Sequence, residues 1–216
     1  MGLITTAGFA GFGFVVTAVL VNAVYIRARL PFPVSAAGLE EVTDAFANVG
    51  EALKRPSVLA PVGWLCLTVF AAGLTAALWD RGSDSSAWAL VGLAGVLMQN
   101  VAFVCVEALR FGMASAAAHD RGSTAGLWGL SNVLFGFNQS FLAMAVLGFT
   151  LAGVGAEFIP VWHAWLGYVS AALLFVSAMA SPYNANGASR LAPIGLIGWL
   201  GWATWIVAYS ITLIYR

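Results

Sequence analysis

The sequence contains very little charge. Only 8% of its 216 residues are charged, nine basic residues balance nine acidic ones, and Lys54 is the only lysine. Proteins bind nucleic acid and anionic lipid head groups through clusters of basic side chains, and this sequence has no such cluster. The composition therefore argues against a nucleic-acid partner and against a polybasic anchor on the membrane surface.

Cysteine and histidine are also scarce. Cys66 and Cys105 lie within apolar runs, where a thiol behaves as a small hydrophobic group, so we expect both to be reduced. His119 lies in a polar segment and His163 near the start of an apolar run, so we expect a turn residue and a membrane-interface residue. No Cys/His spacing typical of a metal site repeats, and the sequence indicates no cofactor.

Apolar residues are abundant, at 61% of the chain, with a mean hydropathy of +0.91. A helix that crosses the ~30 Å core of a bilayer needs about 20 mostly apolar residues. Runs of this kind cover residues 3–26, 58–79, 88–114, 127–152, 159–180 and 191–214. The sequence thus predicts an all-α integral membrane protein, a six-transmembrane-helix bundle that forms a single membrane domain over residues 1–216.

The basic residues predict an orientation. Most of them lie in the first, third and fifth loops, and the opposite side has only Arg81 and Arg216. By the positive-inside rule the odd-numbered loops are cytoplasmic and both termini lie outside. Abundant Ala, Gly and Val beside a single lysine suggest a high-GC bacterial genome, and so a bacterial plasma membrane. The basic residues of the odd loops are Arg27, Arg29, Lys54, Arg55, Arg121 and Arg190.

The first loop predicts an amphipathic helix over about residues 36–54. Its apolar residues are spaced by three and four positions, and acidic residues occupy the rest of the helical wheel. Surface helices that seek anionic lipid are rich in Lys and Arg, whereas this polar face is acidic. We therefore expect the helix to pack on this protein or on a partner. The apolar positions are Leu39, Val42, Phe46, Val49 and Leu53.

The sixth span predicts two different faces. Gly195, Gly198 and Gly201 recur every third residue, as do Trp199, Trp202 and Trp205, and both series share a face with Tyr209. The opposite face is aliphatic, with Leu196, Leu200, Val207 and Ile211. We expect the Gly/Trp face to meet protein or a flat ligand and the aliphatic face to meet lipid. Helix packing and a ligand-binding wall both remain open.

The third and fourth spans carry most of the polar residues found within apolar sequence. They meet at the polar turn of residues 119–123, and residues equidistant from Arg121 should lie at similar depth in antiparallel helices. Glu107 and Arg110 are three residues apart, close enough to pair. We therefore predict a polar seam between these spans. The candidate ligand-binding residues are Gln99, Asn100, Glu107, Arg110, Asn132 and Gln139, with Trp202 of the sixth span.

Two interpretations of this seam remain open: interhelical hydrogen bonds that only hold the bundle together, or a ligand site. The favoured function is the binding or transport of a small polar or amphiphilic ligand. An alternative is an accessory subunit of a larger membrane complex, or a homo-oligomer, formed through the sixth span. A lipid-modifying enzyme with Glu107 as acid/base has less support, because the sequence offers it no second catalytic partner.

Two segments carry a resemblance to a known family. Asp44-Ala-Phe-Ala-Asn48 lies in the polar helix after the first span, and Phe158-Ile-Pro-Val-Trp-His-Ala-Trp-Leu-Gly167 opens the fifth span. With the order of the spans, these segments resemble uncharacterised six-span membrane proteins common in actinobacteria. The resemblance covers most of the chain and implies the same topology, but it brings no activity with it.

Overall fold

Seven α-helices make up nearly all of the computed structural model, which describes residues 2–33, 37–79, 81–184 and 192–215. No strand occurs in these ranges, and six of the helices are long and apolar enough to cross a membrane. The predicted all-α, six-span architecture is confirmed. The helices are α1 (Leu3–Arg27), α2 (Leu39–Ala47), α3 (Lys54–Leu78), α4 (Ser83–His119), α5 (Arg121–Gly155), α6 (Val161–Met179) and α7 (Ala192–Tyr215), with 3₁₀ turns η1 (Gly50–Leu53) and η2 (Ser181–Asn184).

The helix boundaries differ from the predicted ones in the first loop and around α4 and α5. The amphipathic helix predicted over about residues 36–54 ends at Ala47 in α2, the 3₁₀ turn η1 follows, and Lys54 already begins α3. α4 has 37 residues, which at 1.5 Å per residue is about 55 Å, well beyond the apolar core of a bilayer. The predicted turn at 119–123 is shorter than expected, because α5 already begins at Arg121. Two predicted helix boundaries, at residues 36 and 191, lie outside the described residues. The same holds for two of the basic residues used to predict the orientation, Arg190 and Arg216.

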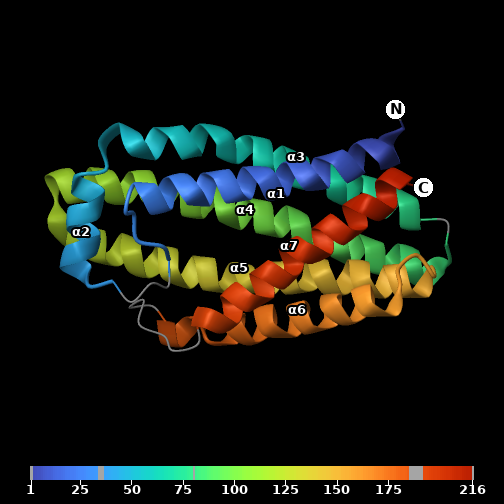
Figure 1. Cartoon of the computed structure of the whole chain (residues 1–216). Helices are drawn as coiled ribbons and strands as arrows, with labels where there is room; N and C mark the ends of the chain where they lie inside the picture. The colour runs from blue at the N-terminus through green and yellow to red at the C-terminus, as the bar shows by residue number, and fades with distance from the viewer. Residues whose placement is uncertain (1, 34–36, 80, 185–191, 216) are drawn as a thin grey trace.

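Each of the six long helices packs mainly on two neighbours, in the order α1, α3, α4, α5, α6, α7 and back to α1. Figure 1 shows both chain termini at one end of this bundle and α2 with the α4–α5 turn at the other. We call these the termini end and the α2 end.

Glycines bring α4 and α5 into close contact along the termini-end half of the bundle. A Cβ at Gly95 would lie 2.5 Å from the backbone nitrogen of Ala145, and one at Gly148 would lie 2.5 Å from that of Gly92. A side chain at any of these positions would force the helices apart. These contacts also confirm the predicted antiparallel register, since the paired residues are nearly equidistant from Arg121.

The two predicted faces of α7 are confirmed. Its glycines pack on α6, where a Cβ at Gly201 would lie 2.2 Å from the hydroxyl of Ser170. Trp202, Trp205 and Tyr209 are buried in the bundle, while the aliphatic residues Leu196, Leu200 and Ile211 are exposed. α7 therefore contributes its aromatic side chains to the interior and leaves its aliphatic face toward lipid.

The helix α2 packs on this protein, one of the two expected possibilities, and covers one end of the bundle. Val42 and Phe46 are buried in a second apolar core with Tyr25, Met113 and Trp128, which come from α1, α4 and α5. The acidic residues Glu40, Glu41 and Asp44 are exposed. The parts of α4 and α5 that extend beyond a bilayer's thickness thus form a platform that the amphipathic helix covers.

Candidate functional site

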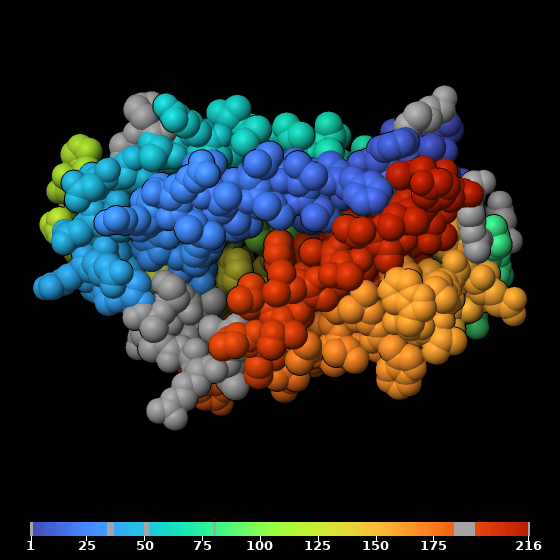
Figure 2. All heavy atoms as spheres, viewed as in Figure 1, coloured from blue at the N-terminus to red at the C-terminus, as the bar shows by residue number. Residues whose placement is uncertain are grey.

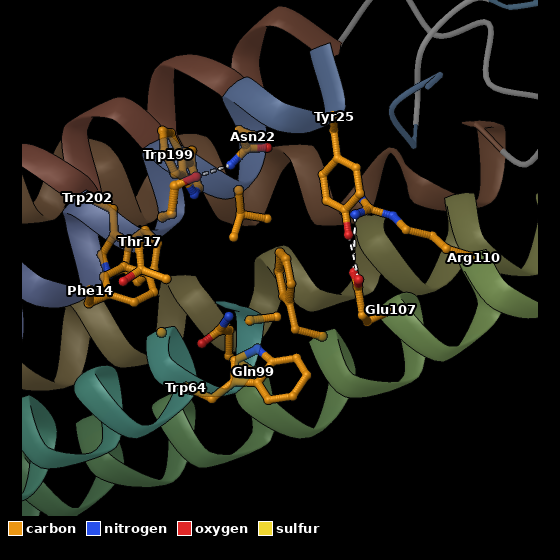
Figure 3. A pocket seen from close by; sticks show the side chains of 15 residues that line it. Phe14, Thr17, Asn22, Tyr25, Trp64, Gln99, Glu107, Arg110, Trp199 and Trp202 are labelled. Carbon is orange, nitrogen blue, oxygen red and sulfur yellow. Dashed lines mark hydrogen bonds and ion pairs between the residues drawn. The ribbon is translucent and has the colours of Figure 1, made fainter. Parts of the chain in front are cut away.

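A buried carboxylate lies beneath the α2 end of the bundle. The Tyr25 hydroxyl donates to Oε1 of Glu107 at 2.5 Å, and the Ser57 hydroxyl donates to the same oxygen. Nη1 of Arg110 donates to Oε2 at 3.2 Å, which confirms the predicted pairing of Glu107 with Arg110 (Figure 3). Three helices, α1, α3 and α4, therefore contribute a partner to this one carboxylate.

Arg110 has a second contact that favours its burial. Its guanidinium lies over the ring of Tyr25, 3.8 Å from the ring centroid, where the ring quadrupole attracts a cation. The side chains of Glu107 and Arg110 are only 13% and 11% exposed. Charges at such depth are tolerated when they are paired and hydrogen-bonded, and the cluster as a whole has no net charge.

A cavity of about 90 Å³ adjoins this cluster and lies between α1, α3, α4 and α7. Since one water molecule takes about 30 Å³ of the liquid, the cavity has room for a small polar group. Its walls are mainly aromatic, and its polar groups lie on α1 and α4 (Figure 3). The aromatic wall residues are Phe14, Trp64, Phe103, Trp199 and Trp202, and the polar ones include Thr17, Asn22, Gln99, Glu107 and Arg110.

Gln99 lines this cavity without using its full hydrogen-bonding capacity. The residue is 4% exposed, and its Oε1 has no hydrogen-bond partner among the described residues. An acceptor left unpaired in a buried site costs about 1–3 kcal/mol. Oδ1 of Asn100, both side-chain amide atoms of Asn138 and Oε1 of Gln139 are likewise buried without a partner among the described residues, so this feature is not confined to the cavity wall.

The structure brings only some of the predicted site residues together. Gln99, Glu107, Arg110 and Trp202 line the cavity. Asn100 instead faces α3, where its amide donates to the Trp64 carbonyl at 3.3 Å and to the Thr68 hydroxyl at 2.9 Å.

The two candidates on α5 lie elsewhere. Asn132 is fully buried. Gln139 is also buried, and its Cδ lies 4.0 Å from the position that a Cβ at Gly195 of α7 would occupy. Neither residue lines the cavity.

The location of the polar groups thus differs from the predicted seam between α4 and α5. Those two helices meet through glycines and apolar side chains such as Phe149. Asn100 and Glu107 of α4 instead find hydroxyl partners on α3 and α1. In the termini-end half, the close approach of the two backbones at Gly92 and Gly95 leaves no room for larger side chains at the contact.

Sequence reasoning missed two partners of the carboxylate. Tyr25 and Ser57 precede Glu107 by 82 and 50 residues, so no spacing rule connects them to it. Tyr25 has the appearance of an interface aromatic beside Arg27, and Ser57 directly follows a basic segment and a proline. Only the packing of α1 and α3 against α4 reveals their role.

His163 lies in the first turn of α6, where we expect the membrane interface, but its side chain is buried against α7. The residue is 1% exposed and is packed against Trp205 and Tyr209, with ring centroids 5.8 and 4.6 Å away. Its Nε2 lies 3.2 Å from the backbone oxygen of Trp205. The neighbouring Trp162 and Trp165 are exposed, so one turn of α6 presents two faces, and α7 covers the one that contains the histidine.

Glu107 and Arg110 differ in the hydrogen-bonding capacity that they leave unused. Both carboxylate oxygens accept hydrogen bonds from protein donors, and the charge is balanced by Arg110. The carboxylate is therefore occupied, while the guanidinium keeps N–H donors beyond the one that Glu107 uses. Comparisons of the chain with protein-family models, with curated proteins and with solved structures gave no match, so the resemblance to actinobacterial six-span proteins stays a prediction.

Proposed function

We propose that this multi-pass membrane protein binds a small polar or amphiphilic ligand in the cavity between α1, α3, α4 and α7. The observation that carries the proposal is the cavity itself, whose lining combines aromatic rings with the polar side chains of Gln99, Glu107 and Arg110. Glu107 uses one N–H of Arg110, and the guanidinium has further N–H donors that a ligand could use.

The cavity combines the features common to small-molecule sites. Such sites are concave, largely apolar and aromatic, with a few convergent polar groups that set orientation. Here the aromatic walls are Trp64, Phe103 and Trp202, and Arg110 and Gln99 add polar groups at two levels of α4. A small ligand with hydrogen-bonding groups fits this lining.

The proposed location is a bacterial plasma membrane with the α2 end in the cytoplasm. Support comes from the distribution of basic residues between the ends of the bundle: Arg81 is at the termini end, and most of the others are at the α2 end. Those others are Arg27, Arg29, Lys54, Arg55 and Arg121.

Two surfaces of the chain suggested the alternative of an accessory subunit or homo-oligomer, namely the Gly/Trp face of α7 and the amphipathic helix α2. The Gly/Trp face of α7 packs on α6 and on the bundle interior, and the apolar face of α2 packs on α1, α4 and α5. Both surfaces are used within this chain and give that alternative no support.

Native mass spectrometry of the protein, extracted from its own membrane in mild detergent, tests the binding proposal. Ala60 lines the cavity, whereas Ala108 is exposed on the outside of α4. Ala60→Leu fills part of the cavity, and Ala108→Leu adds the same atoms outside it. We expect the wild type and Ala108→Leu to retain a non-covalent ligand, and Ala60→Leu to lose most of it.

The thermal unfolding midpoint of each variant in the same detergent serves as the folding control. Equal ligand occupancy in two folded variants, or no bound species in the wild type, would overturn the proposal.

A further inference from the structure

The α2 end of the bundle brings together basic residues that are far apart in the sequence. Arg27 ends α1 and Arg29 follows it, while Lys54 and Arg55 begin α3. All four residues are exposed. Neither pair forms a polybasic run in the sequence, so only the packing of α1 on α3 can combine them.

That packing has a regular antiparallel register. A Cβ at Gly73 of α3 would lie 2.2 Å from the Cβ of Ala7, and one at Gly63 would lie 3.4 Å from Cγ2 of Thr17. Ten residues forward along α1 therefore correspond to ten residues back along α3. Figure 2 shows the two helices side by side at the surface, α1 in blue and α3 in cyan.

The same register places two arginines at nearly the same depth. Ten residues after Thr17 is Arg27, and ten residues before Gly63 is Leu53. Arg55 is two residues from Leu53 along α3. At 1.5 Å per residue, the backbones at Arg27 and Arg55 differ by about 3 Å in height.

Both of these arginines point away from the bundle interior. Two residues from each, Tyr25 and Ser57 extend inward to the same carboxylate oxygen of Glu107. A step of two residues turns a helix by about 200°, and Arg27 and Arg55 are exposed accordingly. Their guanidiniums therefore lie on the outer surface of two helices that pack directly on each other.

The charges of these arginines are not balanced by nearby acids. Arg27, Arg29 and Arg55 form no ion pair with an acidic side chain among the described residues, whereas Arg110 and Arg121 are each paired with one. The surface where α1 meets α3 thus has an excess of positive charge at the α2 end.

Exposed aliphatic side chains continue from the arginines toward the middle of the bundle. On α1 they are Val16 and Leu20, and on α3 they are Val58 and Val62, all between 49% and 74% exposed. Such side chains lie in the hydrocarbon of a bilayer, with the arginines at the level of the head groups. Charge at that level beside an apolar surface matches the two parts of an anionic phospholipid.

Local structure does not favour arginine at two of the three positions. Arg29 has a φ of 53°, a left-handed conformation that usually falls to glycine after a helix. Arg55 lies in the first turn of α3, where the helix dipole favours acidic side chains. Only Arg27, in the last turn of α1, has a charge that its helix favours. Positive charge is therefore present here against local preference.

We propose that Arg27, Arg29 and Arg55 bind the phosphate of an anionic phospholipid on the outer surface where α1 meets α3. Guanidinium groups bind phosphate oxygens through paired N–H donors, and basic sites between transmembrane helices bind anionic lipid head groups. The acyl chains lie along the exposed aliphatic side chains. This site is separate from the cavity, so the two proposals stand or fall independently.

The test uses the whole protein in nanodiscs made of equal amounts of phosphatidylglycerol and phosphatidylcholine. Native mass spectrometry identifies the lipids that stay bound after the nanodisc is removed. We expect the wild type to retain phosphatidylglycerol in several-fold excess over phosphatidylcholine, since only the former has a net negative head group for the arginines to bind.

Two double variants change the net charge equally. Arg27→Gln with Arg55→Gln removes two of the proposed lipid contacts. Arg81→Gln with Arg121→Gln removes two exposed arginines elsewhere, at the termini end and at the α4–α5 turn. We expect the first variant to lose the preference for phosphatidylglycerol and the second to keep it. Arg27→Lys with Arg55→Lys keeps both charges and should keep most of the preference.

Arg29→Gly separates a binding role from a structural one. Glycine adopts the left-handed conformation without a steric penalty, so the thermal unfolding midpoint should stay the same or rise. The preference for phosphatidylglycerol should nevertheless fall, because one of the three guanidiniums is gone.

Equal retention of the two lipids by the wild type, or an unchanged preference in the folded Arg27→Gln, Arg55→Gln variant, would overturn the proposal. Equal losses in the two glutamine variants would also overturn it, because net charge alone would then explain the binding. Should the first variant fail to fold, an unchanged preference in Arg29→Gly decides against the site.

Discussion

The two halves of the bundle use the same kinds of side chain for different purposes. At the termini end, the Tyr209 hydroxyl donates to the Phe149 carbonyl at 2.8 Å, and the Trp205 indole donates to the Thr150 hydroxyl at 3.1 Å. Nearer the middle of the bundle, Trp202 and Gln99 line a cavity instead. Residue type alone does not separate packing from a binding site, because the local supply of partners decides.

The helix contacts differ in the same way. Near the termini end, glycines allow α1 to touch α7 and α4 to touch α5 with hardly any space between backbones. Toward the α2 end α1 and α7 separate, and the space is occupied by an ion pair, aromatic walls and a cavity. Tight packing at the termini end holds α1 and α7 together. The same two helices diverge toward the α2 end, beside the site (Figure 1).

The largest expected effect comes from breaking the ion pair. Glu107→Leu leaves Arg110 buried without its counter-charge, which we expect to lower the free energy of unfolding by about 3–5 kcal/mol. Adding Arg110→Met should restore much of that loss, since the buried charge is then gone. Thermal unfolding midpoints in detergent measure both variants, and a double variant as unstable as the sum of the two single ones would contradict this account.

A smaller effect should distinguish the tight and the open parts of α4. Gly95→Ala places a methyl group 2.5 Å from the backbone of α5, whereas at Gly112 the nearest atom is a Leu127 side-chain carbon at 3.6 Å. We expect Gly95→Ala to cost about 1–3 kcal/mol and Gly112→Ala to be neutral or stabilising by up to about 1 kcal/mol. The same unfolding assay applies, and equal midpoints for the two variants would be evidence against the packing difference.

The smallest expected changes in stability distinguish the packed region from the cavity most directly. Tyr209→Phe removes a satisfied hydrogen bond and should cost about 1 kcal/mol with ligand binding intact. Gln99→Leu removes an unsatisfied acceptor, so stability should hold or rise by about 1 kcal/mol while ligand occupancy falls. Unfolding midpoints and native mass spectra of both variants decide the matter, and a stability loss at Gln99→Leu without loss of ligand would reverse the assignment of the two regions.

Several features could be predicted from local sequence. The pairing of Glu107 with Arg110 follows from their spacing on one helix, and the two faces of α7 follow from residues that recur every third position. The partners of Glu107 on other helices could not be predicted in this way, because Tyr25 and Ser57 lie far from it along the chain. The burial of His163 had no local signal either, since α7 covers it.

The sequence by itself determined that the chain is a bundle of six apolar helices with an amphipathic helix in its first loop. Apolar length and helical periodicity are local properties, and a bilayer converts them directly into spans. Only the tertiary structure decided which helix each polar group of α4 faces. Glycine contacts set how closely helices approach at the termini end, and hydroxyl groups on α1 and α3 provide partners for Glu107 and Asn100. Spacing along one helix does not say which neighbour lies opposite it.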